Sequence, residues 1–246
     1  HQHYVILNSA FKRPIKLKLI KYNRMQAIDS PRPEKYTAPV MTEKEFKILI
    51  KTIKEDELMY TFVMTDLMTG MRRSEILGLE WPEVNLIKGI IDIKKTLLPV
   101  IGGTLHLEKT KNESSKRKIK ISENLINILK KHKQIQKELR LQVGPEYDDS
   151  KEFVFCRADG KPFHPQNYLT WFKKYLKKAN LSNKYNLHTL RHTFATLNLK
   201  NGIPAKIIQE MLGHSTISTT LDLYTHVDLE MQNEAIQKMD EVLDFD

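Results

Sequence analysis

The sequence reads His188-Thr189-Leu190-Arg191-His192-Thr193-Phe194-Ala195-Thr196 near its carboxyl end. Positions three apart lie on one face of a helix, so His188 and Arg191 can point at the same spot from its first turn. The amino end of a helix carries partial positive charge, which attracts an anion. Arginine binds two phosphate oxygens with a planar fork, and histidine exchanges a proton near neutral pH. The stretch therefore indicates a site that handles a phosphate group.

Two further stretches extend this site. The segment Thr69-Gly70-Met71-Arg72-Arg73-Ser74-Glu75 predicts a helix that stops at its glycine, because glycine readily takes the left-handed conformation that ends helices. Arg72 would then be presented from the turn, with Glu75 as its orienting partner. Later, Leu212-Gly213-His214 precedes Tyr224, whose hydroxyl is a candidate nucleophile.

Each feature also has an ordinary interpretation. His188 and His192 are four residues apart and could bind a metal, although no third ligand is evident. The region Thr189 to Leu212 could be a helix-turn-helix that reads DNA without cutting it. The arginine pair could be solvated, and the late tyrosine could be a core residue. These alternatives stay open when each segment is considered alone.

Composition narrows the class of protein. The 246 residues include 40% hydrophobic residues, enough for one large folded domain or two smaller ones. Lysine and arginine exceed the acids by ten, which favours a polyanionic partner over a merely basic soluble surface. The single cysteine, Cys156, excludes an internal disulfide and indicates a reducing, cytoplasmic compartment. No apolar run approaches the roughly 20 residues that cross a membrane, so we expect no membrane partner.

The chain divides at a proline-rich stretch. Residues 11–24 carry six basic residues and no acid, and their spaced apolar residues suggest the end of a helix. Three prolines then fall within residues 29–40, where repeated proline disfavours helix and predicts a linker. We therefore predict a first region at 1–28, the linker at 29–40 and a main domain at 41–246.

Local signals predict the elements of the main domain. Thr42 and Glu45 form a capping box that starts a helix, and a second helix should run from Glu57 to Thr69. Three short β-rich segments, 90–93, 104–107 and 119–121, predict a small antiparallel sheet. The remaining predictions are helices over 123–141, from Pro165, over 189–200, after Pro204, and one capped by Ser218 that carries Tyr224.

Together, the ordered segments resemble the tyrosine recombinase family, of the phage integrase type. The resemblance spans residues 42–227 and rests on four boxes, Thr69–Trp81, His188–Thr196, Leu212–Ser215 and Tyr224–His226. It implies the family's catalytic fold, α+β and mainly α-helical, with a small three-stranded antiparallel sheet. Residues 1–28 resemble the last part of the family's core-binding domain, with the rest absent.

The resemblance also implies a mechanism without a cofactor or metal. The catalytic residues would be Arg72, Lys111, His188, Arg191, His214 and Tyr224. The two arginines would clamp the phosphate, and His214 would hydrogen-bond a non-bridging oxygen. Tyr224 would form a 3′-phosphotyrosyl bond with His188 as base, and Lys111 would protonate the departing 5′ oxygen.

The lysine must be chosen from a basic region. Residues 110–119 align without gaps to the family's lysine, serine, arginine pattern if Lys111 is functional, whereas Lys109 would need a two-residue insertion. From residue 105 to 140 there are eleven lysines and arginines against four glutamates, which suits backbone phosphates. The expected DNA contacts are Arg73, Lys109, Lys116, Arg117 and Lys118.

The partners follow from the same resemblance. It implies a site-specific recombinase that integrates and excises a phage or other mobile element, acting as a homotetramer on double-stranded DNA attachment sites. Residues 222–246 hold eight acids and one lysine, and this tail could exchange between protomers or fold on its own domain. A directionality factor is a further partner to consider. A DNA-binding regulator and a type IB topoisomerase are the competing functions.

Overall fold

The computed structural model describes residues 2–31, 39–100, 102–110 and 116–222. Its contacts divide the chain into two units, His1–Thr37 and Ala38–Asp246, and the division falls inside the stretch predicted as a linker. No helix within the described ranges is both long and apolar enough to span a membrane. The predictions for Lys111 and Tyr224 lie outside the described residues.

The first unit contains helix α1, Gln2–Lys16, and the short 3-10 helix η1, Arg24–Ala27. The two are joined by a 2.6 Å hydrogen bond from the Asn23 amide to the Asn8 side-chain oxygen. Helix α1 ends at Lys16, within the segment 11–24 where the sequence predicted the end of a helix. Lys18 adopts a left-handed backbone with φ of 56°, which an α-helix does not accommodate.

The first two helices of the second unit are set by local signals. Helix α2, Glu43–Ile53, starts with the predicted capping box between Thr42 and Glu45. Helix α3, Glu57–Thr69, ends at Gly70 with φ of 62°, as predicted. A side chain at Gly70 would also collide with its surroundings, because a Cβ there would lie 2.6 Å from Leu212 Cδ2. Glycine at this position therefore permits both the turn and the close packing.

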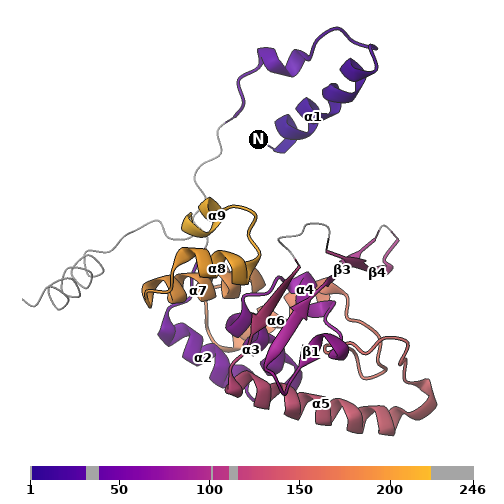
Figure 1. Ribbon diagram of the computed structural model, residues 1–246, viewed down its shortest axis with the longest axis vertical. Coiled ribbons are helices and arrows are strands. Elements are labelled where there is room, and N and C mark those ends of the chain that lie inside the picture. Colours follow the sequence, from indigo (N-terminus) through magenta and orange to yellow (C-terminus); the bar gives the residue numbers. More distant parts are fainter. Residues whose placement is uncertain (1, 32–38, 101, 111–115, 223–246) are drawn as a thin grey trace, which may run out of the picture. The chain divides into compact units, whose positions relative to one another are not determined.

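The strands form two small antiparallel sheets. Strands β1, Val84–Asn85, β2, Ile90–Ile93, and β5, Arg117–Lys120, make a three-stranded sheet in the order β1-β2-β5. Strands β3, Lys95–Pro99, and β4, Leu105–Lys109, pair separately as a hairpin (Figure 1). The predicted pairing of 104–107 with the other two segments is therefore wrong. Pairing with the adjacent β3 encloses a shorter loop and costs less chain entropy.

The remaining described elements include helices at the predicted positions near 123–141, 165, 189–200 and 204, together with a short helix over 73–77 and two 3-10 turns that were not predicted. They are α4, Arg73–Leu77, α5, Glu123–Val143, α6, Pro165–Lys178, α7, Leu187–Lys200, α8, Ala205–Leu212, and α9, Ile217–Leu221, with 3-10 turns η2, Trp81–Glu83, and η4, Gly144–Glu146. The N-cap of α9 is Thr216 and not the predicted Ser218. Thr216 has the extended backbone that a cap requires, whereas Ser218 already lies within the helix.

The core is built around α3, which packs against α5 and α7 (Figure 1). Phe62 of α3 stacks on Tyr168 of α6 at a ring separation of 4.1 Å. A second buried cluster, formed by Phe194, Ala195, Ile208 and Leu212, joins α7 to α8. This packing brings the end of α3, the start of α4, the first turns of α7 and the end of α8 together.

Candidate active site

Arg72 stands at the start of α4 and links it to the end of α8. Its Nη1 donates to Glu75 Oε1 at 2.8 Å, and its Nη2 donates to the Gly213 carbonyl at 2.8 Å. Its backbone N–H also donates to Glu75 Oε2 at 2.8 Å. The side chain remains 36% exposed. Glu75 thus contacts Arg72 as an orienting partner would, and the guanidinium still faces solvent in part.

Arg191, on α7, is almost fully enclosed. Its Nη1 donates to the Gly70 carbonyl at 2.5 Å and its Nη2 to the Leu212 carbonyl at 2.7 Å, and the residue is 7% exposed. Burial, together with the charge of Arg72, lowers the pKa of Arg191 to about 9. The guanidinium therefore keeps its charge at neutral pH while joining the ends of α3 and α8.

Arg117, on β5, also belongs to this network. It donates to both oxygens of Glu75, at 3.0 and 2.9 Å, and to the Met211 carbonyl at 2.6 Å. Its side chain is 7% exposed. The structure thus corrects the expectation that Arg117 contacts DNA, because its guanidinium is directed inward. Strand alternation could have predicted this, since Arg117 shares a strand face with the buried Ile119.

The end of α8 is the common anchor of all three arginines. Its last carbonyls lack partners within the helix and carry partial negative charge. Gly213, with φ of 64°, turns the chain away and leaves them accessible. Three successive carbonyls, those of Met211, Leu212 and Gly213, accept hydrogen bonds from Arg117, Arg191 and Arg72 respectively. The sequence could not show this, because backbone acceptors have no side-chain signature.

Two buried carboxyl groups next to the arginines differ in charge. Burial opposes ionisation of Glu75, which is 1% exposed, but its bonds and charge interactions with Arg117 and Arg72 keep its pKa below the ordinary value. Burial raises the pKa of Asp66, on α3, well above the ordinary value despite the charge of Arg191. Glu75 is therefore ionised at neutral pH, whereas burial favours the neutral form of Asp66, and the three arginines leave the network with a net positive charge.

The two predicted histidines, His188 and His214, lie on different elements, and the charges of the arginines act on both. His188 lies in the first turn of α7, and partial burial plus the charges of Arg73, Arg191 and Arg72 lower its pKa. His214 directly follows Gly213, and burial plus the charges of Arg191 and Arg72 lower its pKa to about 4. Both imidazoles are therefore neutral at pH 7. A neutral imidazole can accept a proton at one nitrogen and donate from the other.

A pH-dependent loss of stability should follow from the third histidine, His192. Burial and the neighbouring charges lower its pKa from 6.5 to about 4 in the folded protein. The unfolded chain therefore binds a proton that the folded protein does not, and this residue's contribution to stability is lost as the pH falls from 6.5 towards 4. The check is urea unfolding of the wild type and a His192→Asn variant across this range.

The variant isolates His192 from other groups whose pKa values differ between the folded and the unfolded protein. Asp66 has a raised pKa and changes stability in the opposite direction, but it does so in both proteins. The stability advantage of the wild type over the variant should shrink as the pH falls. A constant difference would contradict the lowered pKa of His192.

The other expected DNA contacts remain at the surface. Lys109, Lys116 and Lys118 are exposed, and Arg73 is half-buried at the start of α4. Lys109 ends β4 directly opposite Lys95 of β3. These positions are compatible with contacts to backbone phosphates, which stay predictions.

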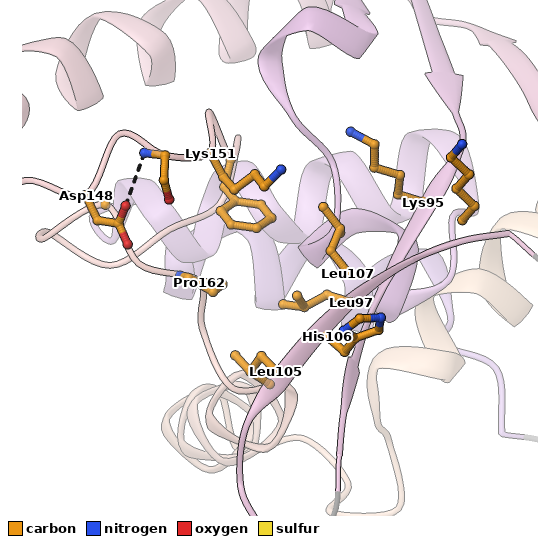
Figure 2. Close-up of a pocket in the computed structure, with 12 residues that line it drawn as sticks. Lys95, Leu97, Leu105, His106, Leu107, Asp148, Lys151 and Pro162 are labelled. Carbon is orange, nitrogen blue, oxygen red and sulfur yellow. Dashed lines mark hydrogen bonds between the residues drawn. The ribbon is translucent and has the colours of Figure 1, made fainter.

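A cavity of about 440 Å³ lies apart from the arginine network, between the β3–β4 hairpin and residues 148–162. Figure 2 shows Leu97, Leu105 and Leu107 along the hairpin, with Asp148 and Lys151 among the facing residues. None of the three arginines lines it. Within the described residues, no cluster of three or more histidine, cysteine or acidic side chains could hold a metal.

Comparison with known proteins assigns the chain to a family. Residues 39–231 match the model of the phage integrase family. The chain therefore belongs to this family, as the resemblance to tyrosine recombinases predicted.

The relatives define the group more closely. The chain is 31% identical to a tyrosine recombinase XerC-like protein of Caldanaerobacter subterraneus over 82% of its own length and 54% of that protein. It is 29% identical to the ICEBs1 integrase of Bacillus subtilis, covering 81% of this chain and 54% of the integrase. The chain thus spans about half the length of these curated relatives.

Solved structures support the fold. The Tn1549 transposon integrase, in complex with transposon right end DNA, superposes with a TM-score of 0.77 at 24% identity, covering 96% of this chain and 77% of that one. The predicted fold class, mainly α-helical with a small antiparallel sheet, is confirmed.

Proposed function

We propose that this chain is the strand-cleaving part of a site-specific DNA recombinase, an integrase that acts through a 3′-phosphotyrosyl intermediate. One observation carries this proposal: Arg72 and Arg191, 119 positions apart by their numbers, are held on adjacent carbonyls directly before His214. The relatives include an integrase of a mobile element, and one similar integrase was solved in complex with DNA. They support double-stranded attachment sites as substrate and a mobile element as the setting.

The arginines suit the transition state better than the ground state. Attack on a phosphodiester builds negative charge on its non-bridging oxygens, and charges fixed beforehand stabilise that change without reorganising. Arg72 and Arg191 are fixed by bonds to carbonyls at the end of α8. His214 is neutral at pH 7 and can add a hydrogen bond from its ring.

The proton transfers are assigned by family resemblance together with the charge states. Phenol has a pKa near 10, so Tyr224 needs a base, and His188 is neutral at pH 7 and able to accept the proton. Lys111 would then protonate the departing 5′ oxygen. The new 5′-hydroxyl later attacks a phosphotyrosyl bond in a partner strand and releases the tyrosine. The linkage keeps the bond energy, so no ATP is needed.

A nicked suicide substrate tests this function directly. Cleavage releases a short strand that cannot return, so the protein should accumulate as a covalent adduct with the DNA. A DNA-binding regulator would give a bound complex and no adduct. A two-site assay then separates recombination from simple relaxation of supercoils, the result expected of a topoisomerase. Absence of any adduct on a bound attachment site would overturn the proposal.

We place the acidic tail of one protomer on a neighbouring catalytic domain, within a homotetramer. Helices α8 and α9 and the turns before them expose apolar side chains, those of Ile203, Ile207, Ile217 and Leu221. The tail offers apolar residues at Leu229, Met231, Ile236, Met239 and Leu243 among its acids. Cytoplasmic localisation and control by a directionality factor belong to the same proposal.

Deletion of residues 229–246 should separate assembly from DNA binding. If the tail docks on a neighbour, its loss should weaken pairing of two sites much more than binding to a single site. Gel-shift titrations with one-site and two-site DNA measure both quantities. Equal losses would instead show that the tail packs on its own domain.

A further inference from the structure

The side chains of Thr220 and His214 form a hydrogen bond next to the arginine network. The Thr220 hydroxyl lies 2.9 Å from His214 Nδ1. Thr220 belongs to α9 and is fully buried, at 0% exposure. It precedes Tyr224 by four positions. The short segment that leads to the candidate nucleophile thus also holds the ring of His214.

The direction of this hydrogen bond can be argued from what else the hydroxyl contacts. A hydroxyl group has one proton to donate, and a buried donor is costly if it has no acceptor. Among the residues that the structure describes, His214 Nδ1 is the acceptor within reach of Thr220. The arrangement is satisfied when the hydroxyl donates and Nδ1 is unprotonated. A neutral ring then carries its single proton on Nε2.

The backbone of His214 is already fixed by other groups. Its N–H donates to the Gln209 carbonyl at 3.1 Å, and its carbonyl accepts from the Gln209 side-chain amide at 3.1 Å. These backbone bonds leave the His214 side chain able to rotate. The hydrogen bond between Thr220 and Nδ1 restricts this rotation, because it holds one edge of the imidazole against α9.

We propose that Thr220 is a positioning residue that holds His214 in the tautomer with its proton on Nε2, ready to donate to a non-bridging phosphate oxygen. This inference rests on the proposed recombinase function. It extends to this chain the general rule that the partner of one ring nitrogen decides what the other can do. The ring could not serve as that donor if Nδ1 carried its only proton and Nε2 faced the phosphate.

Three substitutions test the role of Thr220. Thr220→Val keeps the shape and removes the hydroxyl, Thr220→Ser keeps the hydroxyl, and Thr219→Val removes a hydroxyl from the exposed side of the same helix. Adduct formation on the suicide substrate should slow about 10-fold or more in Thr220→Val, by analogy with metal-binding histidines, where loss of the partner of the other ring nitrogen costs about 10-fold to 100-fold. Single-site DNA binding should be unchanged. Thr220→Ser and Thr219→Val should cleave like the wild type.

Nitrogen NMR of the His214 ring, assigned with a His214→Gln variant, tests the tautomer without DNA or catalysis. The wild type should carry its proton on Nε2, and Thr220→Val should shift the population towards Nδ1. A wild-type ring protonated on Nδ1 would overturn the inference even if Thr220→Val failed to fold. Wild-type cleavage by a folded Thr220→Val variant would also overturn it. If the wild type itself forms no adduct, the proposed function fails instead, and the NMR result still decides the contact.

Discussion

A Tyr224→Phe variant is expected to bind its target duplex with wild-type affinity and to form no covalent adduct. The substitution removes one oxygen atom, the atom proposed to bond to phosphorus, and leaves the aromatic ring. The rate of adduct formation should therefore fall below detection, whereas the arginines proposed to bind phosphate are unchanged.

The measurement is a denaturing gel of the suicide-substrate reaction, read beside a gel shift for binding. Tyr22→Phe is a suitable control, because Tyr22 is an exposed tyrosine of the first unit. It should form the adduct at the wild-type rate. Labelling of the released strand should show a free 5′-hydroxyl. An adduct in the Tyr224→Phe variant would show that another residue is the nucleophile.

The parts of the fold that the sequence predicted well depend on local interactions. The start of α2 is encoded by Thr42 and Glu45, which bond to each other across one turn. The end of α3 is encoded by Gly70, whose backbone needs no distant partner to favour the turn. The sheet pairing failed for the opposite reason. Residues 104–107 carry the signature of a strand but not the identity of its partner, which is decided by the hairpin with β3.

The candidate site also has features that the sequence predicted and features that it could not predict. The boxes identified Arg72, His188, Arg191 and His214, and the structure brings these residues to the neighbouring ends of α3, α4, α7 and α8. The acceptors that hold the arginines are backbone carbonyls, so no residue type reveals them. Arg117 was misjudged because its basic neighbours suggested a surface contact. Its side chain instead lies on the inward face of β5, where it binds Glu75.

The charge arrangement explains why so many arginines are compatible with a folded site. Ionised Glu75 lies between Arg72 and Arg117 and offsets part of their repulsion. The carbonyls at the end of α8 offset more of it through their partial negative charge. Arg191 has no carboxylate bond among the described contacts and binds two carbonyls instead. Its charge is consequently the one of the three that no carboxylate bond compensates among the described contacts.

An Arg191→Lys variant should therefore lose strand cleavage by about 100-fold to 1000-fold, the usual cost of removing one fixed transition-state contact. Lysine keeps the charge, but its ammonium lacks the planar fork that bonds to the Gly70 and Leu212 carbonyls together. Single-turnover cleavage measures the effect, with urea unfolding to confirm that the variant is folded. Arg140→Lys, at an exposed ion pair with Asp149, should leave the rate unchanged. A folded Arg191→Lys variant that cleaves at the wild-type rate would show that charge alone suffices, and that the two carbonyl bonds serve only to join α3 and α8.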